Sequence, residues 1–98
     1  MGTRTVSIKE STIERSFCKK LEKLGLYSIK LSPTSLRGMP DRLVLLNLGE
    51  VCFIEFKRPG KELTELQEHR ASQLKSRGYE CRWYDDADKA IEWIKSKL

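Results

Sequence analysis

The chain has 98 residues, of which 39% are hydrophobic and 34% are charged, with a formal net charge of +5 at pH 7. This length predicts one domain over residues 1–98 and excludes a two-domain architecture. The composition is too apolar for a disordered tail, and charged residues interrupt it too often for a membrane span or a secretory signal. We therefore expect an intracellular, cytoplasmic protein, and the excess of Lys and Arg favours a polyanionic partner such as nucleic acid.

Three cysteines and a single histidine restrict the metal and redox chemistry. Cys18, Cys52 and Cys81 are widely spaced in apolar contexts, so we expect reduced residues of the core. No pair has the spacing of a zinc finger, and His69 lies between charged neighbours on a predicted solvated helix face. The sequence therefore argues against a structural zinc site and against a triad that uses histidine as its base.

The first predicted element is a helix over residues 11–24. Ile13, Phe17 and Leu21 recur at helical spacing, and Gly25 follows as a stop signal. Residues 11–14 fit the capping box S-x-x-E, which ends at Glu14. Alternation over residues 27–31 then predicts a strand, and two prolines and a glycine predict a loop over residues 32–40.

Two further strands, over residues 41–46 and 50–57, are separated by Asn47-Leu48-Gly49. A three-residue hairpin loop commonly ends in glycine, because its last residue takes a left-handed conformation. Such a loop pairs Leu46 with Glu50, and the same register places Asp41 opposite Glu55 on one face. We therefore expect two carboxylates to confront each other, with Cβ atoms about 5 Å apart.

A second helix is predicted over residues 65–77, with a T-x-x-Q capping box at 64–67 and Gly78 as its stop. A strand over residues 80–84 and a terminal helix capped by Asp85 or Asp86 complete the chain. The helix between the third and fourth strands makes a crossover, which implies parallel neighbours and a right-handed connection. The predicted class is α/β, a mixed four-stranded sheet flanked by helices in the order α-β-β-β-α-β-α.

Residues 51–58 carry the most informative pattern. On a strand, Glu55 and Lys57 project to one face and Phe56 to the other. A cross-face salt pair is the ordinary explanation, but Asp41 opposite Glu55 weakens it, because facing like charges destabilise a hairpin unless positive charge lies between them. A divalent metal would supply that charge, and two carboxylates, a backbone carbonyl and waters are typical ligands of magnesium.

These motifs resemble the PD-(D/E)XK nuclease superfamily, and within it the virus-type replication and repair nuclease domain, VRR-Nuc. The resemblance covers nearly the whole chain and rests on Gly38-Met39-Pro40-Asp41, Glu55-Phe56-Lys57, Glu14 on the preceding helix and Gln67 on the following one. It implies a restriction-endonuclease-like core and hydrolysis of phosphodiester bonds with Mg²⁺ or Mn²⁺ as cofactor.

The resemblance also implies a catalytic set of Glu14, Asp41, Glu55, Lys57 and Gln67. The metal ligands would be Asp41, Glu55 and the main-chain carbonyl of Phe56, with Glu14 as a further candidate. Lys57 would orient or activate the attacking water and stabilise charge on the phosphate. Glu14 and Gln67 each have a second interpretation, as the N3 residue of a capping box.

Basic residues near the same strand end are candidates for holding the DNA backbone: Lys30, Arg37, Arg42, Arg58 and Lys61. Each alone is an ordinary surface charge, but as a group they suit a phosphate track. The resemblance to small members of the family implies a structure-selective endodeoxyribonuclease. We expect a Holliday junction resolvase of phage or bacterial recombination and repair, acting as a homodimer because an isologous dimer matches a nearly two-fold symmetric junction.

Three alternatives to the resolvase remain. The same site would suit a nicking or site-specific endonuclease on duplex DNA, and nothing in the sequence excludes an RNA substrate. A nucleic-acid-binding module that does not cleave is the third alternative, but such a module has no need to confront two carboxylates. Trp93 and other apolar residues of the terminal segments are candidates for the dimer interface.

Overall fold

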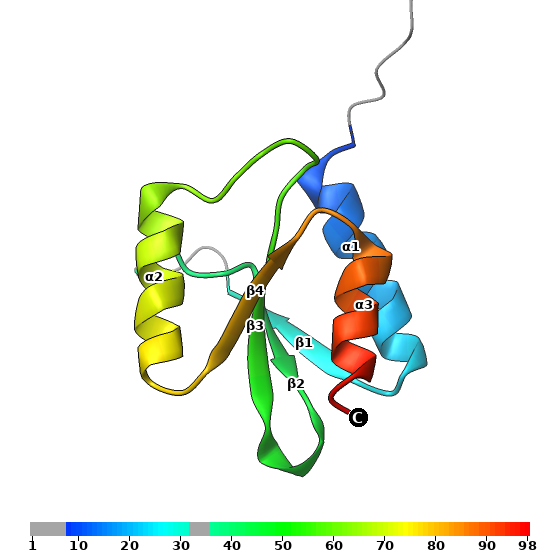
Figure 1. Cartoon of the computed structure of the whole chain (residues 1–98). Coiled ribbons are helices and arrows are strands. Elements are labelled where there is room, and N and C mark those ends of the chain that lie inside the picture. The colour runs from blue at the N-terminus through cyan, green and yellow to red at the C-terminus, as the bar shows by residue number, and fades with distance from the viewer. Residues whose placement is uncertain (1–7, 32–35) are drawn as a thin grey trace, which may run out of the picture.

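A computed structural model describes residues 8–31 and 36–98, which form one four-stranded sheet with helices on both faces (Figure 1). The elements in chain order are α1 (Glu10–Lys23), β1 (Tyr27–Lys30), β2 (Arg42–Leu45), the 3₁₀ turn η1 (Asn47–Gly49), β3 (Val51–Phe56), α2 (Glu65–Ser76), β4 (Glu80–Tyr84) and α3 (Ala87–Lys95). In Figure 1, α1 and α3 lie side by side on one face of the sheet and α2 lies on the other. The predicted α/β class and element order are confirmed.

The strands are ordered β1-β2-β3-β4, and the sheet is mixed as predicted. The first three strands are antiparallel, whereas β4 runs parallel to β3 after the crossover through α2. Arg42 pairs with Ile54 and Leu45 with Val51, so the predicted hairpin register is correct. One further step along this ladder places Asp41 opposite Glu55.

The core lies between α1, α3 and the face of the sheet that they cover. Its fully buried side chains include Phe17, Leu21, Ile54, Phe56 and Ile94. The rings of Phe17 and Phe56 pack with their centroids 5.0 Å apart. Because side chains alternate along a strand, this core fixes Ile54 and Phe56 inward and turns Glu55 toward the face of α2.

One predicted helix cap needs correction. The structure shows no capping box at residues 11–14, because α1 begins one residue earlier, with Lys9 at its N-cap and no side-chain cap. Glu14 is only 8% exposed and turns toward the sheet instead of back to the helix terminus. In the hairpin loop, Gly49 has the predicted left-handed conformation, with a φ of 77°, and Leu48 before it also has a positive φ, of 60°. The cap predicted at Asp86 is present, since its carboxylate accepts from the backbone N–H of Lys89.

The cysteines are free, as expected for reduced core residues; Cys52 and Cys81 are buried, whereas Cys18 is half-buried. His69 is exposed on α2, as predicted. Across residues 8–31 and 36–98, none of the helices combines the length and apolar character needed to cross a membrane.

Candidate active site

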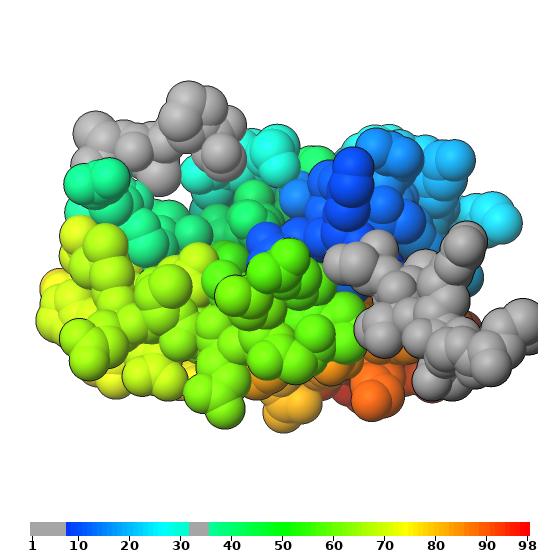
Figure 2. All heavy atoms as spheres, turned by 90° about the horizontal axis from the view of Figure 1, so that it is seen from above, coloured from blue at the N-terminus to red at the C-terminus, as the bar shows by residue number. Residues whose placement is uncertain are grey.

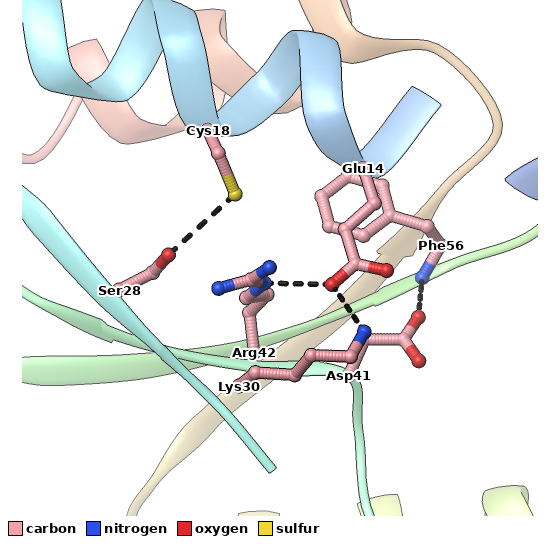
Figure 3. Close-up of polar contacts among 7 residues, drawn as sticks. All are labelled: Glu14, Cys18, Ser28, Lys30, Asp41, Arg42 and Phe56. Atoms are coloured by element: carbon pink, nitrogen blue, oxygen red, sulfur yellow. Dashed lines mark hydrogen bonds and ion pairs between the residues drawn. The ribbon is translucent and has the colours of Figure 1, made fainter. Parts of the chain in front are cut away.

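Asp41 lies at the entrance to β2 and reaches across the ladder to β3. Its Oδ2 accepts a hydrogen bond from the backbone N–H of Phe56 at 2.8 Å (Figure 3). The same register places Pro40 opposite Phe56, and proline has no N–H to donate. The N–H and C=O of one strand residue point toward the same neighbouring strand. The Phe56 carbonyl therefore points toward β2, where Pro40 has no N–H to give it a hydrogen bond.

Glu55 is 6% exposed, and only one of its two carboxylate oxygens has a hydrogen-bond partner among the described residues. Its Oε2 accepts from Gln67 Nε2 at 3.1 Å, whereas its Oε1 is buried without a hydrogen-bond partner in the described part of the chain. Burial and then the negative charge of Asp41 raise the pKa of Glu55 to about 8, against the lowering effects of the Lys57 cation and of the backbone N–H of Asp41. A buried carboxylate oxygen without a donor is costly when charged, so this position favours a proton or a cation.

The pKa of Asp41 is also raised. The main cause is burial, which outweighs the hydrogen bond from Phe56, and the charge of Glu14 raises it further. The cation of Lys30 acts in the opposite direction. Two carboxyl groups with raised pKa values therefore meet at the junction of β2 and β3. A cation between them would lower the cost of ionising both.

Lys57 follows Glu55 on the same face and is 9% exposed. Among the described residues, no carboxylate pairs with its ammonium group. Lys57 lines a hollow of about 590 Å³ together with Lys9, Arg58 and Lys61. Figure 2 shows this end of the molecule, where the green segment after β3 lies beside the dark blue start of α1. Glu10 and Glu62 also line this hollow, so its four positive charges exceed its negative charges by two.

Glu14 occupies a neighbouring position on the α1 side of the sheet. Its Oε2 accepts from Arg42 Nε at 2.7 Å and from Lys30 Nζ at 2.9 Å, as Figure 3 shows. Within the described ranges, no three side chains of His, Cys, Asp or Glu converge as a metal cluster. The structure thus brings Asp41, Glu55 and Gln67 together, and it engages Glu14 with two of the basic residues that were predicted to contact DNA.

Gln67 forms the predicted helix cap and also contacts Glu55. Its Oε1 accepts from the backbone N–H of Thr64 at 2.9 Å while the Thr64 hydroxyl accepts from the Gln67 N–H, which completes the predicted capping box. Its Nε2 is then left to donate to Glu55. The cap fixes the amide orientation, so the same side chain that begins α2 also positions the buried carboxylate.

Gly38 explains how α2 is held close to the motif loop. It has a φ of +83°, and a Cβ at this position would lie 2.7 Å from Leu66 Cγ and 3.0 Å from the Leu66 carbonyl. Only glycine permits this approach. Nearby, Arg70 Nε donates to the Arg37 carbonyl at 2.6 Å, which ties the loop to α2 a second time.

Comparison with known proteins identifies the family. "Putative nuclease p44" of Acyrthosiphon pisum secondary endosymbiont phage 1 is 33% identical over 81 residues, which are 83% of this chain and 87% of that protein. A solved structure described as "VRR_NUC domain" superposes with a TM-score of 0.76 at 28% identity, over 85% of this chain and 94% of its own. The chain belongs to the VRR-Nuc nuclease family. No family model matches it.

Sequence reasoning missed two features of the candidate site in this VRR-Nuc protein. Lys9 joins the basic hollow only because the start of α1 packs beside the segment after β3, and no local pattern encodes that contact. Trp83 lies opposite Glu55 across the parallel pair β3–β4, on the same face. The crossover predicted that the two strands pair, but a parallel register cannot be counted from a loop as a hairpin register can.

Proposed function

We propose that this VRR-Nuc protein is a metal-dependent, structure-selective endodeoxyribonuclease. The observation that carries the proposal is the confrontation of Asp41 with Glu55, whose Oε1 is buried without a donor among the described residues. These two carboxylates and the carbonyl of Phe56 are hard oxygen ligands, and they fit a magnesium or manganese ion that keeps part of its hydration shell. When bound, such an ion would polarise the scissile phosphoryl group and lower the pKa of a coordinated water.

The protein side chains supply orientation and charge. Gln67 holds Oε2 of Glu55 and so leaves Oε1 as the ligand atom. Lys57 places an ammonium beside Glu55, where it can orient the attacking water and stabilise negative charge that develops on the phosphate. Glu14 fixes Lys30 and Arg42 beside Asp41, so we assign it a supporting electrostatic role in the catalytic set.

The basic hollow around Lys57 supports contact with the DNA backbone. Arg58 and Lys61 are exposed, and with Lys9 they place positive charge where phosphates flank the reacting group. Arg37 is exposed in the motif loop and is a further candidate. Lys30 and Arg42 are partly neutralised by Glu14, so we expect them to contribute less to DNA affinity than Arg58 and Lys61.

A homodimer acting on a four-way junction is part of the proposal, and an apolar sheet face supports it. Tyr27, Ile29 and Leu45 lie on the face opposite α1 and are 71%, 48% and 36% exposed. A second copy of the chain would bury this face, and an isologous pair presents two sites to a two-fold symmetric junction. Trp93 is less suited to the interface than predicted, because Arg82 and Lys97 each pack 4.8 Å from its ring.

Cleavage of a labelled four-way junction, compared with linear duplex and single strand, tests the function. With magnesium or manganese, we expect paired symmetric cuts near the branch, and we expect none with chelator or with Asp41→Asn. This variant removes the charge of Asp41 but keeps an acceptor for the Phe56 N–H. Equal cutting of duplex would replace the resolvase by a nicking or site-specific endonuclease, and binding without cleavage would refute the nuclease site.

Sedimentation velocity tests the dimer separately. We expect Ile29→Asp to yield monomers, because it places a charge in the centre of the apolar face. Leu48→Asp is the matched control, since Leu48 is an equally apolar but fully exposed residue at the hairpin tip. A monomeric wild type, or dimers that both variants leave intact, would refute this interface.

A further inference from the structure

A cavity of about 290 Å³ opens between α2 and the sheet, directly beside Glu55. It exists because α2 stands away from the sheet, and none of its residues is buried. Leu63, Ala71 and Cys81 give the cavity apolar walls, and its size is close to the lower end of small-ligand pockets. The cavity is continuous with the proposed site, because Glu55 and Gln67 line both.

Trp83 forms an aromatic wall of this cavity. It is the register partner of Glu55 in the parallel pair, so the two residues lie on adjacent strands about 4.8 Å apart and on the same face. Trp83 is 41% exposed, and within the described residues no ring or cation packs on its indole. The other tryptophan, Trp93, is by contrast covered by two cations and Tyr84.

Polar groups complete the cavity. Gln67 contributes an amide at the Glu55 end, and Lys75 contributes an exposed ammonium that has no carboxylate partner in the described part of the chain. A flat aromatic surface, apolar walls, an amide and a nearby cation together match a nucleobase and its phosphate. An indole stacks on any base, because every base presents a π face.

We infer that this cavity holds an unpaired nucleobase next to the scissile phosphate, stacked on Trp83. The inference rests on the proposed nuclease site, which brings the sugar-phosphate backbone to Glu55 at the mouth of the cavity. A base can enter only after it leaves its own stack, and this costs least where the nucleotide is already unpaired. The cavity would therefore give the site its preference for branched or otherwise interrupted DNA.

A double-mutant cycle on binding tests this inference. The cleavage-deficient Asp41→Asn protein is combined with Trp83→Ala, and the affinity for a junction is measured by fluorescence anisotropy with and without an abasic nucleotide beside the cut. On the intact junction, Trp83→Ala should weaken binding about 5- to 150-fold, the range of one stacked base. On the junction that lacks the stacked base, the same substitution should have almost no effect.

Tyr79→Ala is the matched control, because Tyr79 is a similarly exposed aromatic residue just before the start of β4, at the other end of that strand from Glu55. It should weaken binding to both junctions equally or not at all. Equal losses for Trp83→Ala on both junctions, or no loss on either, would overturn the base site. Cleavage of the intact junction by the wild type reports the nuclease proposal independently, since the binding cycle needs no cleavage.

Discussion

From the buried carboxyl group of Glu55 we predict how the stability of the metal-free protein depends on pH. Its pKa is raised from 4.5 to about 8, so the folded state keeps a proton that the unfolded state has already lost between these pH values. Where the folded state binds more protons, stability falls as pH rises. The metal-free protein should therefore become less stable from about pH 5 to pH 8.

The magnitude follows from the same shift. One extra bound proton gives a slope of at most about 1.4 kcal/mol per pH unit, and the full shift corresponds to a cost on the order of 5 kcal/mol for charging Glu55. A small domain has a total stability of about 5–15 kcal/mol, so this one group can decide whether the metal-free chain folds at pH 8. The raised pKa of Asp41 adds an effect of the same sign, which begins at lower pH.

Glu55→Gln isolates this effect, because it removes the titrating group but keeps an oxygen that can accept from Gln67. In urea unfolding followed by circular dichroism in chelator, the wild type should lose stability between pH 5 and pH 8 while the variant changes much less. Glu50→Gln, at an exposed position beside the hairpin loop, should behave as the wild type.

Magnesium should restore wild-type stability at pH 8 by occupying the place of the proton, and it should have little effect on Glu55→Gln. Parallel pH curves for the wild type and Glu55→Gln would refute the reasoning, since they would show that Glu55 ionises in the fold at little cost.

Three further substitutions test neighbouring parts of the site and the hairpin. Lys57→Ala should lower turnover about 10²- to 10³-fold, while the magnesium concentration at the midpoint of a thermal-shift titration stays nearly unchanged. Loss of the magnesium-induced shift would instead show that Lys57 is needed for ion binding. Gly38→Ala should destabilise the protein by about 1–3 kcal/mol in urea unfolding, because its Cβ meets Leu66, and a stable variant would contradict that close approach. Leu48→Asn should raise stability by about 1 kcal/mol without changing cleavage, because asparagine tolerates the positive φ; unchanged stability would show no strain there.

The sequence predicted most of the fold because its strongest signals are local. Gly49 fixed the length of the hairpin loop, and the loop length set the register that brings Asp41 opposite Glu55. The periodicity of Ile13, Phe17 and Leu21 likewise identified the helix face that packs in the core. The catalytic roles of Asp41 and Glu55 stay predictions.

The errors occur where tertiary contacts override a local pattern. The motif S-x-x-E at 11–14 predicted a helix cap, but Lys30 and Arg42 offer Glu14 two charge-assisted hydrogen bonds inside the fold. These bonds are stronger than a bond to a solvated backbone N–H, so the glutamate turns inward. The sequence separations of 16 and 28 residues explain why no local window contains this signal.

Pro40 shapes the candidate site because it has no backbone N–H to donate. An ordinary residue at position 40 would donate its N–H to the Phe56 carbonyl and continue the ladder, and the carbonyl would then be satisfied. Pro40 leaves that acceptor available, and Asp41 takes over the Phe56 N–H with its side chain. The backbone pairing of β2 with β3 therefore stops beside the buried carboxylate of Glu55. The last ladder pair is Arg42 with Ile54, so Asp41, Glu55 and a Phe56 carbonyl that receives no ladder hydrogen bond from Pro40 come together just beyond the end of the ladder.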